Sequence, residues 1–174
     1  MTTVKAIPIS TLRIMIVGLL PLFAFSVPLS HAGEKGTFTG SWMANGSKEA
    51  LSLGKNRETA LFKLSGHINL RNDRIGKQKD FYANCIGLSD FSTGSDIRCV
   101  WRSINGEEIY LTLKGTRMEE GSQVTGNIVG GTGAFDGITG YLRFTWTSMS
   151  FAQVNDETGI GGFSQDVTGS YQLP

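Results

Sequence analysis

The stretch Gly126–Trp146, which reads GNIVGGTGAFDGITGYLRFTW, decides the fold of this chain. Its first half is dense in glycine, and that density indicates backbone positions with positive φ or a close approach between strands. Its second half alternates apolar and polar side chains, as a half-buried strand does. The stretch therefore predicts a tight turn that leads into a long strand of a β-sheet.

These glycines do not match a phosphate-binding loop. A dinucleotide fingerprint needs G-x-G-x-x-G between a strand and a helix, but Asp136 stands at the third glycine position after Gly131 and Gly133. No Gly-Lys-Ser/Thr follows either, and alternation typical of a strand replaces the helix. We interpret the segment as a structural turn in which Gly131 or Gly133 adopts positive φ. The turn glycines are Gly130, Gly131, Gly133, Gly137 and Gly140.

Residues Val129–Gly140 resemble the G-G-T-G-x-F-x-G-x-x-G signature of the allene oxide cyclase and dirigent superfamily, and its secreted bacterial members in particular. The resemblance implies a calycin-like β-barrel. In the bacterial members a strand pair with two cysteines precedes the signature, as Cys85 and Cys99 do here. The carboxylate, asparagine and aspartates that act in allene oxide cyclases and dirigent proteins cannot be matched to this chain. The resemblance therefore implies a fold and not an activity.

Alternating patterns predict strands through the rest of the chain. The clearest run is 58–70, where Ala60, Phe62 and Leu64 begin one apolar face. Other strands are expected from 37 to the pair Asn45-Gly46, and at 80–88, 96–104, 107–117, 123–129, 138–146 and 163–173, with a short additional one at 50–53. Regular hairpins without an amphipathic helix predict an all-β fold. We expect a single antiparallel calycin-like β-barrel of about eight strands, because closure removes exposed edges.

The N-terminus has the features of a secretory signal peptide. Lys5 and Arg13 precede an apolar run from Ile14 to Val27, and small residues follow at Ser30 and Ala32. Residues 1–32 are expected to be cleaved, which leaves 33–174 as one domain of a secreted or periplasmic protein. The apolar run is shorter than the about 20 residues of a membrane helix, so no membrane attachment is expected after cleavage.

The balance of charges and the small number of metal-ligating side chains argue against several classes of function. The 16 Lys and Arg residues balance 15 Asp and Glu residues, which predicts no nucleic-acid partner. His67 is the only histidine after residue 32, so no metal or other cofactor is expected. Asp90, Ser92 and Asp96 alternate across a turn, and we prefer a solvated turn to a calcium site because the loop holds only two carboxylates.

Cys85 and Cys99 are predicted to form a disulfide. The two cysteines are equidistant from Ser92, so a hairpin turn centred there places them opposite each other. Directly paired residues have α-carbons about 4.5–5.5 Å apart, a separation that a disulfide accepts. Export to an oxidising compartment and an even cysteine count favour the bond. Two buried free thiols are the alternative.

Aromatic residues on the expected interior faces are the candidate ligand-binding residues, namely Phe62, Phe81, Trp101, Phe144 and Trp146. A barrel of about eight strands has room either for its own side chains or for one small ligand. The leading expectation is a protein that binds a small apolar or aromatic molecule. Trp42, in a Gly40-Ser41-Trp42 motif similar to the G-x-W entry of lipocalins and avidins, is interpreted as a barrel plug or as ordinary core.

Two other classes of function stay open. An enzyme of the cyclase or isomerase type could confine a reactive substrate with little acid–base machinery. A carboxylate buried in the lumen would favour it. A structural or protein-binding module would instead use the exposed apolar face where Leu61, Ile86 and Leu88 are expected, and a homo-oligomer could form through that face.

Overall fold

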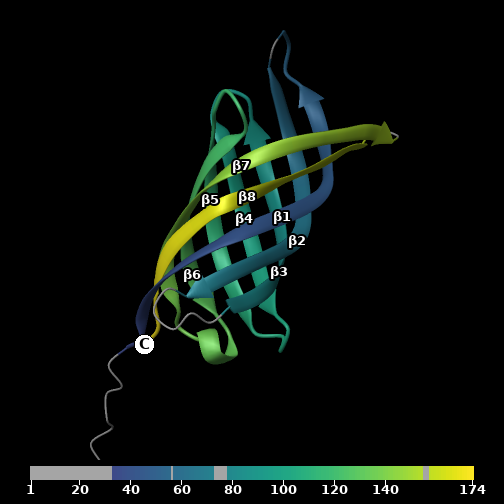
Figure 1. Cartoon of the computed structure of the whole chain (residues 1–174). Coiled ribbons are helices and arrows are strands. Elements are labelled where there is room, and N and C mark those ends of the chain that lie inside the picture. Colours follow the sequence, from purple (N-terminus) through teal and green to yellow (C-terminus); the bar gives the residue numbers. More distant parts are fainter. Residues whose placement is uncertain (1–32, 56, 73–77, 155–156) are drawn as a thin grey trace, which may run out of the picture. The chain divides into compact units, whose positions relative to one another are not determined.

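A computed structural model describes residues 33–55, 57–72, 78–154 and 157–174. For residues 150–154 and 157 the description covers the backbone only. The proposed signal peptide, residues 1–32, lies outside the described residues. Eight antiparallel strands form a closed barrel in which each strand pairs with its neighbours in the sequence and β1 pairs with β8 (Figure 1). The strands are β1 Lys35–Ser52, β2 Glu58–Asn72, β3 Gln78–Asp90, β4 Gly94–Ser103, β5 Glu108–Arg117, β6 Ser122–Gly131, β7 Thr139–Val154 and β8 Glu157–Gln172. The predicted all-β barrel of about eight strands is confirmed.

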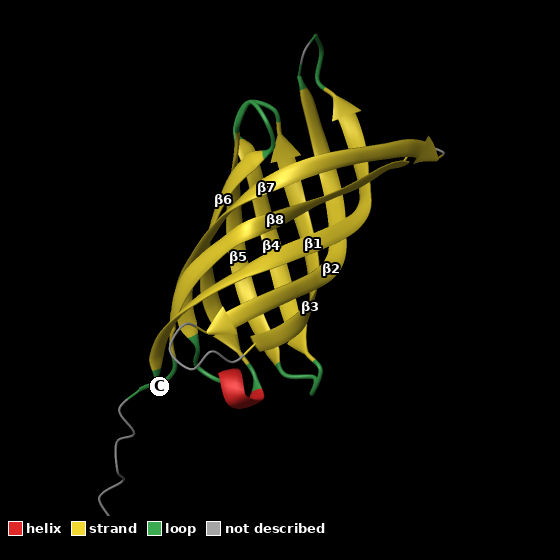
Figure 2. Cartoon of the chain, in the orientation of Figure 1, coloured by secondary structure: helices red, strands yellow, loops and turns green. Residues whose placement is uncertain are grey.

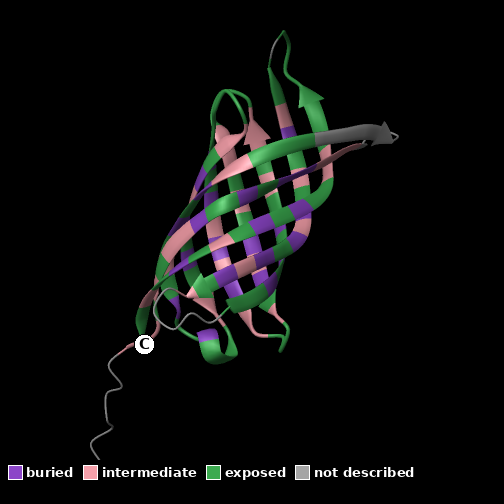
Figure 3. Ribbon diagram, in the orientation of Figure 1, coloured by how far each residue is buried: buried purple, intermediate pink, exposed green. Residues whose placement is uncertain are grey.

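Period-two alternation separates the lumen from the outer surface (Figure 3). On β2 the face shared by Ala60, Leu64 and Ile68 is buried, whereas Leu61 and His67 are exposed. Successive side chains of a strand point to opposite faces, so one face of every strand fills the barrel. The hydrophobic core of this protein is therefore the barrel interior.

β1 is longer than the sequence pattern predicts, and two predictions about it are wrong. The pair Asn45-Gly46 does not end the strand, because Asn45 pairs with Ser65 and Gly46 with Leu64 of β2. A Cβ on Gly46 would lie 1.8 Å from the carbonyl oxygen of Lys63, so this glycine permits a close strand approach rather than a turn. The short separate strand expected at 50–53 is the end of β1.

A second Asn-Gly pair does form the predicted hairpin. Asn105-Gly106 connects β4 to β5, where Gly106 has φ of 84° and its N–H donates to the carbonyl oxygen of Ser103. β7 and β8 are also longer than expected: β7 continues beyond Trp146 to Val154, and β8 begins at Glu157 rather than near Phe163. Part of the predicted last turn, residues 155–156, lies outside the described residues.

The glycine-rich segment includes the turn between β6 and β7, but only Gly133 and Gly137 of the five predicted turn glycines lie in that turn. Gly130 and Gly131 end β6, and Gly140 lies in β7. The segment contains a single turn of 3-10 helix, η1 (Gly133–Phe135), which Figure 2 shows in red at the end of the barrel that carries the C-terminus. Gly133 has φ of 61° and Gly137 has φ of 71°, so the predicted positive φ is confirmed at Gly133. Gly131 is needed for another reason: a Cβ there would lie 2.6 Å from the carbonyl oxygens of both Glu108 and Phe135.

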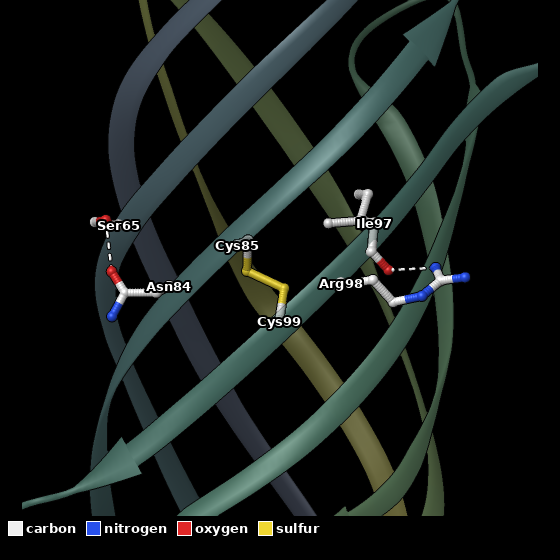
Figure 4. Close-up of a disulfide and its surroundings, with 6 residues drawn as sticks. All are labelled: Ser65, Asn84, Cys85, Ile97, Arg98 and Cys99. Atoms are coloured by element: carbon white, nitrogen blue, oxygen red, sulfur yellow. Dashed lines mark hydrogen bonds between the residues drawn. A yellow bond between two sulfur atoms is a disulfide. The ribbon is translucent and has the colours of Figure 1, made fainter.

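The predicted disulfide joins Cys85 and Cys99, whose α-carbons are 4.2 Å apart (Figure 4). The two residues pair directly across β3 and β4, as the symmetry of the hairpin about Ser92 predicts. Both side chains are buried among the residues of the core. The covalent bond therefore fixes the β3–β4 register from inside the barrel.

A bulge in β8 interrupts the alternation. Gln165 and Asp166 are both exposed, although they lie between the buried residues Ser164 and Val167. The register of β8 against β1 and against β7 shifts at this place. An extra residue in one strand produces such a shift and bends the strand.

The Asp166 carboxylate takes over part of the hydrogen bonding that the bulge removes. Its Oδ1 atom accepts hydrogen bonds from the backbone N–H of Thr145 and from the hydroxyl of Ser164, both at 2.8 Å. Partial burial raises the pKa of Asp166, but the hydrogen bonds from Thr145 and Ser164 outweigh it and hold this pKa below its usual value of 3.8. The folded protein therefore favours the ionised carboxylate.

Replacing both cysteines by alanine, in Cys85→Ala/Cys99→Ala, should lower the free energy of unfolding by about 3 kcal/mol, because the bond closes a loop of roughly 15 residues. Urea denaturation of the two proteins measures the difference. A reductant should destabilise the wild type and leave the double variant unchanged. Two thiols that alkylate in the unreduced native protein would contradict the bond.

Gly133→Val and Gly131→Val should each lower the free energy of unfolding by about 1–3 kcal/mol, the first through backbone strain at positive φ and the second through a steric clash. Gly115→Ala is the control, since the nearest atom to a Cβ there is 3.4 Å away. Thermal melts compare the three variants. Wild-type melting temperatures for both valine variants would show that neither constraint exists.

Asp166→Asn should destabilise the protein by roughly 1 kcal/mol at neutral pH, because a neutral amide accepts weaker hydrogen bonds than a carboxylate. The folded pKa lies below the usual 3.8, so the stabilisation by the ionised group is complete above that value and is lost as pH falls through the folded pKa. The stability difference between wild type and variant should shrink below pH 3.8. Glu119→Gln, at an exposed turn position, controls for the change in net charge. A stability difference between wild type and Asp166→Asn that does not depend on pH would contradict the role of the ionised Asp166 carboxylate.

Candidate functional site

The middle of the barrel is filled by aromatic side chains. The ring of Trp42 lies 6.4 Å from that of Trp101, 5.3 Å from that of Phe144 and 5.2 Å from that of Trp146, as measured between centroids. Trp42 and Trp101 are 4% and 1% exposed. This layer, which we call the aromatic partition, leaves one hollow at each end of the lumen. Trp42 packs at the centre of the core rather than closing an end.

The first hollow, the terminal pocket, lies at the end where β1 begins and β8 ends. It has a volume of about 310 Å³, at the lower limit for small-molecule sites. All the strands from β1 to β6 contribute lining residues, as does β8, and η1 contributes Ala134 and Phe135. Its apolar lining consists of Phe38, Leu70, Phe81, Trp101, Ile109, Ile128, Ala134, Phe135, Ile138 and Leu173.

Four polar side chains border the terminal pocket. Asn72 donates from Nδ2 to the Tyr171 hydroxyl at 2.6 Å, and this hydroxyl donates to a carboxylate oxygen of Glu34 at 2.7 Å. The Lys79 ammonium lies 4.6 Å from the centroid of the Phe135 ring. The pocket thus combines an apolar interior with a few ordered polar groups, which is the usual composition of a small-molecule site.

The indole N–H of Trp101 has no hydrogen-bond partner among the described residues, although Trp101 is almost completely buried and borders the terminal pocket. A buried donor without a partner costs free energy. A ligand that carries a hydrogen-bond acceptor could satisfy this group. The indole nitrogen itself is enclosed by protein, so an acceptor of a ligand in the pocket could reach it only after neighbouring side chains move.

The second hollow, the distal pocket, lies at the opposite end, near the β3–β4 and β5–β6 turns, and has a volume of about 260 Å³. The structure does not bring the five predicted ligand-binding residues together. Phe81 and Trp101 border the terminal pocket, whereas Phe62, Phe144 and Trp146 border the distal pocket. Trp42 connects the two groups, because its ring packs against Trp101 on one side and against Phe144 and Trp146 on the other.

Sequence reasoning missed most of the terminal pocket. Two of its residues lay in patterns that the sequence shows. The alternation of β1 could have assigned Phe38 to the lumen, and the glycine signature could have assigned Phe135. Nothing local could have selected Glu34, Asn72 or Tyr171. Glu34 precedes the first strand, Asn72 ends the second and Tyr171 lies in the last, so only closure of the barrel brings them together.

The other residues singled out from the sequence lie outside the lumen or in turns. His67 is exposed, with its ring 5.5 Å from that of Tyr82. Asp90 accepts hydrogen bonds from the backbone N–H and hydroxyl of Ser92, and these bonds, ahead of the nearby Arg57, lower the pKa of Asp90. Its carboxylate therefore shapes the β3–β4 turn. Among the described residues no three His, Cys, Asp or Glu side chains gather as a metal site.

The described part of the chain offers little acid–base machinery inside the barrel. Its only fully buried polar side chain is that of Ser164, so no described carboxylate is buried in the lumen. Glu108 has a lowered pKa because it accepts hydrogen bonds from Arg102 and then Tyr110, but this group lies on the outer faces of β4 and β5. The site as described can bind and orient a molecule.

Comparison with known proteins identifies no relative: no family model matches the chain, and no curated protein or solved structure does. Among the described residues no helix is long and apolar enough to cross a membrane.

Proposed function

We propose that this protein is an exported barrel that binds one small apolar or aromatic molecule in the terminal pocket. The observation that carries the proposal is the pocket itself, a hollow of about 310 Å³ with a mainly apolar lining at one end of the lumen. A preformed apolar hollow with a few fixed polar groups is the usual form of such sites. The buried Cys85–Cys99 disulfide is compatible with an extracellular or periplasmic location.

The lining also defines the chemistry of the proposed ligand. An apolar or aromatic body would contact Phe81 and Phe135, and one acceptor oxygen would pair with the indole N–H of Trp101. At the lower limit of the usual volume range, the pocket suits a molecule of one or two rings rather than a long chain. Phenols and aryl ketones of that size have this combination of groups.

We also propose that the chain is related to the allene oxide cyclase and dirigent superfamily. The closed eight-stranded barrel and the glycine-rich turn between β6 and β7 support that relationship. An isomerase or cyclase activity has weaker support, because no carboxylate of the described residues is buried in the lumen. In such a reaction the barrel would contribute mainly by confining the reactive substrate.

A protein-interaction role is a second candidate function. The three residues expected on an exposed apolar face are adjacent on the outside of the barrel: Leu61 pairs directly with Leu88 across β2 and β3, and Ile86 pairs with Lys63 one step along. Their exposed fractions are 62% for Leu61, 60% for Ile86 and 50% for Leu88. Clustered exposed apolar side chains are typical of interaction surfaces.

The three tryptophans provide a direct test of ligand binding, because Trp42, Trp101 and Trp146 each give one indole N–H resonance. These resonances can be assigned by Trp→Phe variants of the ¹⁵N-labelled protein. Titration with naphthalene, 2-naphthol, toluene and acetophenone should move the Trp101 resonance most. The acceptor-bearing 2-naphthol and acetophenone should cause larger shifts than naphthalene and toluene.

Ala134→Phe is the matching variant, because Ala134 is an exposed residue of η1 that borders the terminal pocket. A phenyl group there should cover the opening and weaken binding about tenfold or more. Val129→Phe, on the exposed outer face of β6, adds the same group away from the pocket and should leave binding unchanged. A Trp101 resonance that none of the four compounds moves would refute the proposed site.

A further inference from the structure

The distal pocket differs in chemistry from the terminal pocket. Its floor is aromatic and consists of Trp42, Phe62, Phe144 and Trp146. Trp42 is buried, whereas Phe62 and Trp146 are only partly buried and pack against the core. The floor therefore presents flat apolar rings toward the opening of the barrel.

Hydroxyl groups surround this floor. The lumen-facing positions that follow the aromatic layer are Ser89 on β3, Ser95 on β4, Ser122 on β6 and Ser148 on β7, and all four serines border the distal pocket. The Ser89 hydroxyl donates to the carbonyl oxygen of Ala60 at 3.4 Å. The hydroxyls of the other three serines have no hydrogen-bond partner among the described residues. Three strands thus supply groups that can both donate and accept hydrogen bonds.

A second observation at the same pocket is independent of the serines. Trp42 is 4% exposed and borders the distal pocket, and its indole N–H has no hydrogen-bond partner among the described residues. The indole nitrogen is itself enclosed, so a ligand reaches this donor only after neighbouring side chains move. A purely apolar ligand would leave it unpaired and would also bury the serine hydroxyls without partners, which costs free energy. The ligand that fits must therefore carry several polar groups.

The charged groups around the opening balance in sign, since Arg117 and Glu119 lie there together with two ion pairs. Lys48 forms an ion pair with Glu58 at 2.8 Å, and Arg57 forms one with Asp90 at 3.4 Å. A wider outer basin of about 500 Å³ adjoins the distal pocket and shares Lys48 and the four serines with it. Because opposite charges balance there, the opening favours neither an anion nor a cation.

We propose that the distal pocket binds a neutral pyranose sugar, free or as the terminal unit of a glycoside. A pyranose ring has an apolar C–H face, which can pack on the partly exposed rings of Phe62 and Trp146. Its hydroxyls donate and accept, as those of Ser95, Ser122 and Ser148 do. One sugar oxygen accepts from the Trp42 indole N–H once the side chains that enclose this nitrogen have moved. The outer basin accommodates the remainder of a glycoside.

The indole resonances distinguish this site from the terminal pocket. Titration of the ¹⁵N-labelled protein with methyl β-D-glucopyranoside, methyl β-D-galactopyranoside and methyl α-D-mannopyranoside, to about 10 mM for a millimolar binder, should move the Trp42 and Trp146 resonances with at least one sugar. The Trp101 resonance should not move. Cyclohexanol, which has one hydroxyl on a saturated ring, should bind at least tenfold more weakly than the best sugar.

Paired serine variants test the hydroxyl groups. Ser95→Ala/Ser122→Ala should weaken the best sugar about tenfold, because two neutral hydrogen bonds are lost. The matched control Ser41→Ala/Ser170→Ala removes two exposed hydroxyls and should leave the affinity unchanged. If the first double variant loses its dispersed spectrum, each single variant is measured, with a decrease of about threefold expected. Trp146→Ala should abolish binding, whereas Trp146→Phe should retain part of it.

Three results with the sugars, and one with cyclohexanol, would overturn the proposal. The results with the sugars are Trp42 and Trp146 resonances that no sugar moves, a sugar that moves the Trp101 resonance alone, and serine variants that bind as tightly as the wild type. Cyclohexanol binding as tightly as the best sugar would also overturn it, because the hydroxyls would then not be recognised. If no aryl ligand binds near Trp101, the proposal for the terminal pocket fails but this test still stands, because the two pockets lie on opposite sides of the aromatic partition.

Discussion

The hydrogen-bonded pairing of β1 with β8 is the constraint on which the rest of this structure depends. It closes the sheet, so that none of the eight described strands is left at an edge. It also defines an inside, because alternate residues of every strand must now share one enclosed volume. The residues of the terminal pocket come from both ends of the chain, and Glu34, Asn72 and Tyr171 lie together only because the barrel closes.

An eight-stranded barrel encloses little more volume than its own side chains need. In this protein the interior volume is divided unevenly along the axis. Large rings meet at the centre, where Trp42 contacts Trp101 and Phe144. Near the distal opening the lining includes four serines and two glycines beside Ile97, Met149 and Ile160. The result is two small pockets of different chemistry in place of a single continuous cavity. This difference is the reason that we propose an aryl ligand for the terminal pocket and a sugar for the distal pocket.

Closure also has a cost in hydrogen-bond geometry, and the β8 bulge shows how it is met. The shift in register leaves the backbone N–H of Thr145 opposite a side chain, and the carboxylate of Asp166 accepts its hydrogen bond. Ser164 supports the same carboxylate from a buried position. The disulfide acts in a comparable way on the other side of the barrel, since it fixes the register of β3 and β4 from within.

Local patterns in the sequence determined most of the fold. Alternation identified the strands and their buried faces, symmetry about Ser92 paired Cys85 with Cys99, and glycine density located the β6–β7 turn. These features depend on a few neighbouring residues, so the sequence by itself was sufficient. It also identified the interior aromatic residues but could not divide them between two pockets, because their heights along the barrel depend on the stagger of strands distant in the sequence.

Tertiary structure decided what local patterns leave ambiguous. Asn45-Gly46 and Asn105-Gly106 are the same dipeptide, yet the first lies within β1 and the second forms a turn. The difference arises because β1 has partners on both sides at Asn45-Gly46, so hydrogen bonding continues through the pair. The bulge at Asp166, the aromatic partition and the two pockets likewise arise from closure, since each requires contacts between strands that only the closed barrel brings together.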